Sequence, residues 1–267
     1  MKKFVVKRLL ISIVLLFFVS MIIYGIMRCM PASFVETKAM ELSQKPGAKS
    51  YDEWLQQLNA AYGLDDSVIQ GYFVWASKAI RGQFGDSWLY NQPVLQKFAS
   101  VIWYSFALGL ASFILEIIIA IPAGVAAARK QYSLTDYSIT VIALIGISLP
   151  SFFFATILKW IFAVKLNWLD LYGIVGRMHQ QLSPMGQFLD IAKHMIMPVL
   201  TLTIVSIGSL MRYTRTNMLE VLNADYIRTA RAKGLPEKKV INHHAFRNIL
   251  IPIITLLGGT LPSLFGG

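Results

Sequence analysis

Long apolar runs alternate with shorter polar segments along the chain. The runs lie at Leu9 to Met27, at about Val101 to Ala128, Tyr137 to Val164 and Ile191 to Met211, and from Ile249 to the end. A membrane-spanning helix needs about 20 apolar residues to cross roughly 30 Å of hydrocarbon. Only helices and closed β-barrels pair all of their backbone polar groups inside a membrane. The runs lack the alternation of barrel strands, so we predict helices. The pattern predicts an all-α polytopic membrane protein with five spans.

The first run follows a basic start, as in a secretory signal. It is uninterrupted for about 19 residues, whereas a signal core has about 7–15. We therefore predict that residues 1–30 form a cytoplasmic end and a retained transmembrane helix. Lipid attachment at Cys29 is disfavoured because Arg28 stands where such sites have a small residue.

The segment 31–100 is too polar to lie in the membrane. Its stretch SYDEWLQQLNAAYGLDDSVIQGYFVWASKAI predicts two short amphipathic helices broken at Tyr62 to Asp65. We expect a small helical cap between the first two spans. Residues 101–267 would then form the core domain, with a polar loop at 212–248.

Composition supports this class, because 55% of the 267 residues are hydrophobic and only 15% are charged. Charged residues approach about a quarter of an ordinary soluble domain. The net charge of +11 could suit binding to nucleic acid or to an anionic lipid surface. The placement of the charges along the sequence distinguishes between these two partners. The single cysteine excludes an intrachain disulfide and a multi-cysteine metal site.

The basic residues gather in particular segments. Loop 212–248 has eight Lys and Arg against three acids, whereas segment 31–100 has six against seven. The N-terminus has four bases and no acid before the first run. The positive-inside rule places the N-terminus, the short loop after the second run and loop 212–248 in the cytoplasm, and the cap outside. Topology therefore explains the basic excess without nucleic acid, which we do not expect as a partner.

The basic loop contains the string NADYIRTARAKGLPEKK, residues 223–239. Asn223 is a good N-cap, Asp225 in the first turn suits the helix dipole, and Gly234 before Leu235 and Pro236 is a stop signal. These signals predict a helix of about three turns from Ala224 to Lys233. Small side chains between the bases would let another surface approach closely: Ala230, Ala232 and Gly234.

Several strings resemble, in the same order, the permeases of bacterial ABC importers in the oligopeptide, dipeptide and nickel branch. They are KRLL, YGLDDSVIQGYFVW, RGQFGDSW, SLPSFFFATIL, MRYTRTNMLEVLNADYIRTARAKGL and HHAFRNILIP. The resemblance covers nearly the whole chain. It implies a type I ABC permease fold with six spans, of which five are visible, so we expect the sequence to stop before the sixth.

The same resemblance implies that the basic loop holds a coupling helix, inserted into a groove on a separate ATP-hydrolysing subunit. The wider superfamily begins this loop with Glu-Ala-Ala, where the present chain has Arg228, Thr229 and Ala230. The implied coupling residues are Asp225, Tyr226, Arg228, Thr229, Ala230, Arg231, Ala232, Lys233 and Gly234. No GxxxxGK[ST] phosphate loop occurs in the sequence.

The expected system is a cell-membrane importer for peptides or a related small solute. Its other parts would be a second homologous permease subunit, two ATP-binding subunits that bind ATP and Mg²⁺, an extracellular substrate-binding protein and membrane lipid. This chain would have no catalytic residue, cofactor or metal site of its own. His243 and His244 are adjacent and point in different directions on a helix, which disfavours a metal site.

Three residues are candidates for the translocation path: Glu116, Pro150 and Ser151. Glu116 lies midway along the second span, where an ionisable group faces protein or water. It could line the path, serve as a proton site, or make a structural hydrogen bond between helices. Pro122, Pro150 and Pro198 could be hinges or packed kinks.

Two other functions fit parts of the pattern. An ion-driven secondary transporter would use Glu116 and need no ATPase, and a membrane-anchored nucleic-acid binder would use the basic helix. Neither accounts for the resemblance within segment 31–100. Arg28 and Lys159, near span ends, are expected to extend toward the membrane interface.

Overall fold

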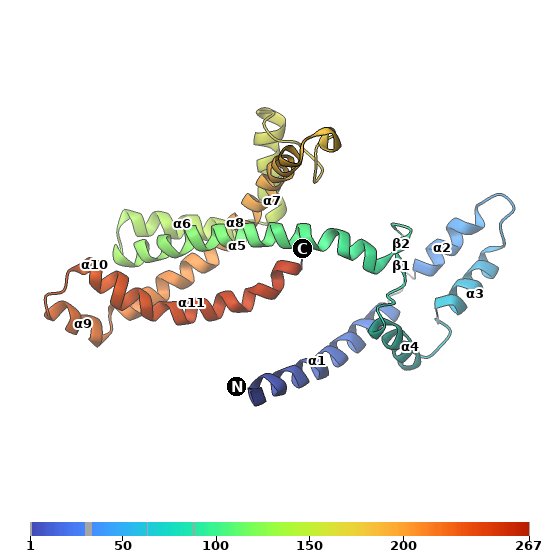
Figure 1. Ribbon diagram of the computed structural model, residues 1–267, viewed down its shortest axis with the longest axis horizontal. Coiled ribbons are helices and arrows are strands. Elements are labelled where there is room, and N and C mark those ends of the chain that lie inside the picture. The colour runs from blue at the N-terminus through green and yellow to red at the C-terminus, as the bar shows by residue number, and fades with distance from the viewer. Residues whose placement is uncertain (1, 30–33, 63, 88, 267) are drawn as a thin grey trace. The chain divides into compact units, whose positions relative to one another are not determined.

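The computed structural model describes residues 2–29, 34–62, 64–87 and 89–266. Its internal contacts separate two compact units, Met1–Phe98 and Ala99–Gly267. The first contains α1 (Lys2–Arg28), α2 (Phe34–Ser43), α3 (Tyr51–Tyr62), α4 (Val68–Ile80) and an antiparallel pair of short strands, β1 (Asp86–Ser87) and β2 (Gln92–Pro93). Figure 1 shows these elements in blue to green. Helices α3 and α4 confirm the two predicted helices, whereas α2 and the strand pair were not predicted.

Tyr72 of α4 joins that helix to α1. Its ring is only 3% exposed, and its hydroxyl donates to the carbonyl oxygen of Phe17 at 3.2 Å and lies 2.9 Å from Ser20 Oγ. At the end of α1, Arg28 Nη2 donates to the carbonyl oxygens of Leu64 and Asp66, at 2.9 and 2.8 Å. The Arg28 guanidinium therefore binds the turn before α4. Its position at the membrane interface stays a prediction.

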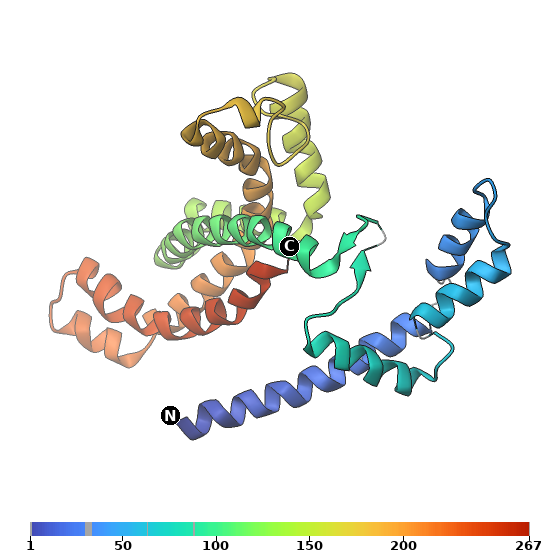
Figure 2. The same cartoon turned by 45° about the vertical axis from the view of Figure 1, so that its right-hand side comes forward.

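The second unit is built from apolar helices with short connections. Its elements are α5 (Val94–Arg129), which enters it at Ala99, α6 (Leu134–Ser148), α7 (Ser151–Leu158), the π-helical turn η1 (Lys159–Lys165), η2 (His179–Gln181), α8 (Pro184–Leu222), α9 (Asp225–Ala232), α10 (Glu237–Lys239), the π-helical turn η3 (Val240–Ala245), α11 (Phe246–Thr260) and η4 (Leu261–Phe265). Helices α6 and α11 both pack on α8. Helix α7 packs on the part of α8 that is N-terminal to the contact with α6 (Figures 1 and 2). Helix α8 is thus the common partner of the unit.

The third predicted span is not one continuous helix. Helix α6 ends before Leu149, and the path turns by 103° into α7 and η1. Pro150 causes the break, because it disfavours the helical conformation of the preceding residue, and Leu149 is extended at φ −91° and ψ 135°. Four described helices are long and apolar enough to cross a membrane, and the bent pair would make five spans if it crosses as one.

Two glycines allow α6 and α8 to cross closely. A Cβ atom on Gly146 would lie 2.6 Å from the carbonyl oxygen of Ile204, and one on Gly208 would collide with the carbonyl oxygen of Ala143. The helix backbones therefore touch where only glycine fits, as in other tightly packed membrane helices.

An ion pair fixes the start of α6 to the later part of α8. Arg215 donates from Nε and Nη2 to the two carboxylate oxygens of Asp136, at 2.6 and 2.8 Å. Asp136 is 2% exposed and also accepts from the backbone N–H of Tyr132 at 3.0 Å. A bidentate pair satisfies the buried carboxylate and gives the contact a fixed geometry. This pair was not predicted from the sequence.

Candidate functional site

Helix α9 lies in the predicted coupling segment but has different ends. It begins at Asp225 with Ala224 as N-cap and ends at Ala232, so it is about two turns long rather than three. Asn223 is not its N-cap, because that residue closes α8 and its side-chain amide donates to the carbonyl oxygen of Leu219 at 3.0 Å. Gly234 has φ +74°, a left-handed conformation that suits the predicted stop.

One face of α9 is buried in the chain's own core. Ile227 is fully buried and Ala230 is 7% exposed, and both belong to the core cluster that includes Val240, Ile241 and Ala245 of η3. The expectation that Ala230 lies on the docking face is therefore wrong. The remaining predicted coupling residues are exposed: Asp225, Tyr226, Arg228, Thr229, Arg231, Ala232, Lys233 and Gly234.

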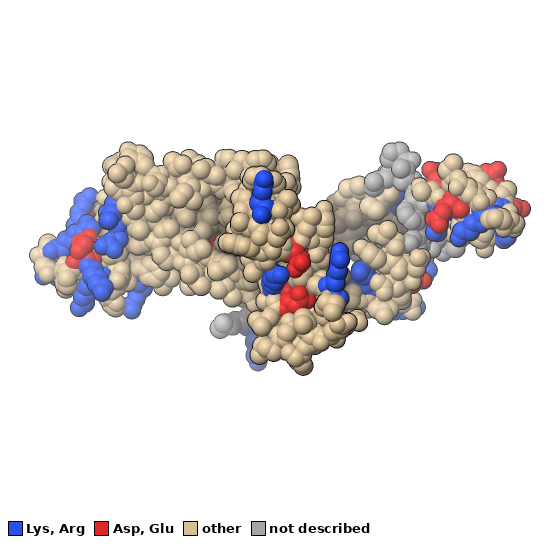
Figure 3. All heavy atoms as spheres, turned by 90° about the horizontal axis from the view of Figure 1, so that it is seen from above, with Lys and Arg blue, Asp and Glu red and all other residues tan. Residues whose placement is uncertain are grey.

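A salt bridge holds the turn between α9 and α10. Arg231 Nη2 donates to Glu237 Oε1 at 2.8 Å, and its Nε donates to Oε2 at 3.2 Å. These hydrogen bonds raise the pKa of the Arg231 guanidinium above its ordinary value. Arg231 was expected to contact a partner, but in this chain it fixes the turn around Gly234. Figure 3 shows Lys and Arg gathered at the end of the unit that carries α9 and α10.

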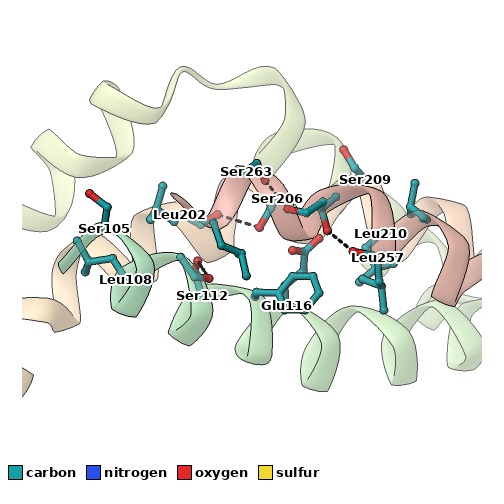
Figure 4. A pocket seen from close by; sticks show the side chains of 15 residues that line it. Ser105, Leu108, Ser112, Glu116, Leu202, Ser206, Ser209, Leu210, Leu257 and Ser263 are labelled. Carbon is teal, nitrogen blue, oxygen red and sulfur yellow. Dashed lines mark hydrogen bonds between the residues drawn. The ribbon is translucent and has the colours of Figure 1, made fainter. Parts of the chain in front are cut away.

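A cavity of about 470 Å³ lies between α5, α8, α11 and η4. Its polar lining residues include Glu116 and six hydroxyl side chains: Ser105, Ser112, Ser206, Ser209, Thr260 and Ser263 (Figure 4). The carboxyl group of Glu116 is next to the Ser206 hydroxyl, which donates to the carbonyl oxygen of Leu202 at 2.9 Å. Ser112 and Thr260 also donate to carbonyls of their own segments, at 2.9 and 2.8 Å. The acceptor lone pairs of these hydroxyl oxygens and the carboxyl group of Glu116 remain available to bind a donor in the cavity.

A second cavity, also of about 470 Å³, lies between α7, η1, the loop after η1 and α8. Its polar lining comes from Ser151, Lys159, Asp170, Tyr172, His194 and Thr201. Leu202 of α8 lines both cavities, the one beside Glu116 and the one beside Ser151. Pro150 lines neither cavity and forms the N-cap of α7.

Four polar residues of this second cavity were not predicted from the sequence: Asp170, Tyr172, His194 and Thr201. Asp190 and His194 are spaced four apart on α8, which places them on one face, but their partners come from the loop after η1. Lys159 Nζ lies 4.9 Å from the centroid of the Tyr172 ring. Its predicted extension to the membrane interface stays a prediction. Only the folded loop brings these groups together.

The adjacent histidines of η3 are not among the residues that line either cavity. The rings of His243 and His244 make an edge-on contact with centroids 5.2 Å apart. Within the part of the chain that the structure describes, no group of three or more His, Cys, Asp or Glu side chains is arranged to hold a metal ion.

Comparison with known proteins gives matches along the whole chain. Residues 120–267 match the family described as binding-protein-dependent transport system inner membrane component, and residues 1–109 match the N-terminal family of the same transport systems. The oligopeptide transport system permease protein AppB of Bacillus subtilis is 35% identical over 268 residues, which cover 100% of this chain and 81% of AppB. A putative peptide permease protein of Brucella ovis is 33% identical over 270 residues, with 100% and 81% covered. The oligopeptide transport system permease protein OppB of Salmonella typhimurium is 34% identical over 269 residues, with 100% and 80% covered.

Proposed function

Because the chain belongs to the binding-protein-dependent transport system inner membrane components, we propose that it is the permease subunit of an ATP-driven peptide importer, in which α9 couples ATP hydrolysis to transport. The observation that carries this proposal is the two-sided character of α9. Its inner face is anchored by Ile227 and Ala230, while its outer face exposes Arg228, Ala232 and Lys233. A helix held from one side and free on the other can transmit the movement of a docked partner into the helices behind it.

The mechanism is a shift between two arrangements of the permease. Two ATPase subunits would close on ATP and Mg²⁺ and move their docked helices together, which turns the path from inward-facing to outward-facing. The core links α9 to η3, α8 and α11, so a displacement of α9 reaches the cavity-lining helices. The full assembly would contain this chain, a second permease subunit, two ATPases and an extracellular binding protein that delivers the peptide.

Both cavities along α8 belong to the proposed path. Glu116 lines one, Ser151 lines the other, and Leu202 lines both. Polar groups in apolar helices are costly unless they face protein or water, and the serine-rich wall of the first cavity fits a wetted passage. Cap segment 31–100 would lie outside the membrane and α9 inside.

Cysteine labelling tests the path assignment. The native Cys29 is exposed and would first be replaced by serine. In that background, Ser151→Cys and Ser206→Cys are expected to react with a membrane-impermeant thiol reagent at least tenfold faster than Ile118→Cys, which lies 61% exposed on α5 outside the cavity lining. The measurement is the labelling rate in the assembled transporter with and without ATP. Equal rates at all three positions would contradict the assignment.

The proposed function is tested by reconstituting the chain with its candidate partners in liposomes. We expect peptide uptake that requires ATP, both ATPase subunits and the binding protein, and ATP hydrolysis that rises when the loaded binding protein is added. Uptake that continues without ATPases and follows an ion gradient would instead support an ion-coupled carrier.

A charge exchange separates the two possible roles of Arg231. The Arg231–Glu237 pair is 42% and 52% exposed, and exposed pairs contribute about 0.2–1 kcal/mol. Arg231→Glu is therefore expected to lower peptide-stimulated ATP hydrolysis about two- to fivefold. Adding Glu237→Arg should restore it to within about twofold, because the salt bridge forms again with reversed charges. No recovery in the double variant would assign Arg231 to the ATPase contact instead.

A further inference from the structure

The second cavity, beside α7, carries opposite charges that a simple passage does not need. Its polar walls place an ammonium group, Lys159, a carboxylate, Asp170, and an imidazole, His194, around one space of about 470 Å³. The rest of the lining is largely apolar or neutral and includes Phe152, Met197 and Leu202. Small-molecule sites of this size commonly combine an apolar wall with a few fixed polar groups.

The orientation of His194 is fixed from behind. Its side chain is only 3% exposed, and its Nδ1 lies 2.8 Å from the backbone carbonyl oxygen of Asp190. A carbonyl oxygen only accepts, so Nδ1 carries the hydrogen and the neutral ring has a lone pair at Nε2. Nε2 is buried and has no hydrogen-bond partner among the described residues, and His194 is one of the residues that line the cavity.

Asp170, on the loop after η1, lies next to this nitrogen. Its Oδ2 is 3.5 Å from His194 Nε2, without the alignment of a hydrogen bond. A carboxylate oxygen and an imidazole lone pair are both acceptors, and two acceptors at this distance leave room for a donor that binds both. Lys193 Nζ donates to the same carboxylate oxygen at 3.3 Å, but Lys193 is not part of the cavity lining. Asp170 is 52% exposed and so accessible to a ligand.

The Lys159 ammonium group provides the complementary charge. It lies over the Tyr172 ring at 4.9 Å, and within the described residues it forms no ion pair with Asp or Glu. An ammonium group held against an aromatic ring in a partly apolar cavity is a good partner for an anionic ligand group.

The loop that carries Asp170 is itself held in place by α8. Asp190 Oδ2 accepts from the backbone N–H of Gly176 at 2.9 Å and lies 2.7 Å from His179 Nδ1. These contacts use Asp190 entirely for structure, so Asp170 remains the carboxylate that faces the cavity.

We propose that this cavity binds the zwitterionic main chain of a short peptide, with Asp170 and His194 accepting from its terminal ammonium group and Lys159 binding its carboxylate. The inference rests on the proposed peptide importer and adds a specific site for both charged ends. The apolar wall of Phe152, Met197 and Leu202 would take the side chains of the peptide without selecting among them.

The test measures peptide binding to the purified complex of permease and ATPase subunits without the binding protein, so that the latter's own selectivity does not contribute. Saturation-transfer NMR suits weak ligands, and the probes are dialanine, N-acetyl-dialanine and dialanine amide. The unaltered complex is expected to bind dialanine at least tenfold more tightly than either capped peptide. Equal binding of all three probes, or no binding of dialanine, would overturn the proposal.

Three variants test which residue binds the ammonium end of the peptide and which binds its carboxylate end. Asp170→Asn should remove the preference over the N-acetyl peptide and keep the preference over the amide, and Asp170→Glu should recover part of the loss. Lys159→Gln should have the opposite pattern. Lys165→Gln is the matched control, because Lys165 lies over the Trp160 ring at 5.3 Å and does not line the cavity. Variants that keep both preferences would overturn the site.

The function of the complex is measured in parallel. If the complete transporter, with its binding protein, shows peptide-stimulated ATP hydrolysis but the variants bind all three probes as the unaltered complex does, the site is wrong and the proposed importer stands. If peptide stimulates neither hydrolysis nor uptake in the unaltered transporter, the proposed function itself is wrong.

Discussion

Replacing Ala232 by tryptophan is expected to reduce peptide-stimulated ATP hydrolysis and uptake at least tenfold, while the permease still folds. Ala232 is exposed on the outer face of α9, between the exposed Arg231 and Lys233. A large side chain at this exposed position would prevent a close fit in the groove of an ATPase. A tenfold effect corresponds to about 1.4 kcal/mol, modest for a bulky residue placed at a packed interface. Copurification of the ATPases and coupled hydrolysis are the measurements.

Two further tryptophan variants control for the size of the new side chain. Ala230→Trp should reduce the yield of folded permease, because Ala230 is 7% exposed and packs in the core with Ile227. Ser77→Trp, on an exposed position of α4, should leave ATPase copurification unchanged. If Ala232→Trp copurified with the ATPases and coupled normally, the outer face of α9 would not be the docking surface.

Gly208→Leu is expected to prevent stable folding of the second unit. A Cβ atom at Gly208 would collide with the backbone carbonyl oxygen of Ala143 and lie 2.8 Å from Ile147 Cγ1. The carbonyl belongs to helix α6 and cannot rotate away, so α6 and α8 would have to separate. We expect a loss of about 3 kcal/mol or more, at the upper end of overpacking effects. The measurements are the apparent melting temperature and the yield of monodisperse protein in detergent.

Gly258→Ala provides the matched control within another helix. A Cβ atom there meets no atom within 4 Å, and alanine costs less backbone entropy than glycine in a helix. The variant should melt at or slightly above the temperature of the unaltered protein. A Gly208→Leu protein with unchanged melting temperature would show that α6 and α8 do not pack as closely as described.

The hydrogen-bond partners of the polar residues could not be predicted from the sequence. Asp136 and Arg215 are separated by 79 positions, and no local pattern pairs them. Arg28 binds carbonyl oxygens of Leu64 and Asp66, which become neighbours only when α4 packs against α1. Residues His194 and Asp170 became site candidates only once the loop after η1 was seen against α8. Hydrogen-bond geometry depends on tertiary placement, so sequence identifies the groups without identifying their partners.

The coupling helix was predicted better than the cavities because its signals are local. The stop at Gly234 and the position of the basic segment follow from residues a few places apart, whereas the direction of Ala230 depends on η3 packing beneath α9. Glu116, Pro150 and Ser151 were named as path candidates, but it was not foreseeable that Glu116 and Ser151 line two different cavities.

The sequence by itself determined the class of protein, the position of its apolar helices and the segment that holds the exposed basic helix, because run length, charge and turn residues act locally. Only the tertiary structure decided that the third run bends by 103°, that Ala230 faces inward while Ala232 faces outward, and that Leu202 lines two cavities. The physical reason is that close packing and paired charges depend on which distant surfaces meet, and an apolar helix can bury any of several faces until its neighbours are in place.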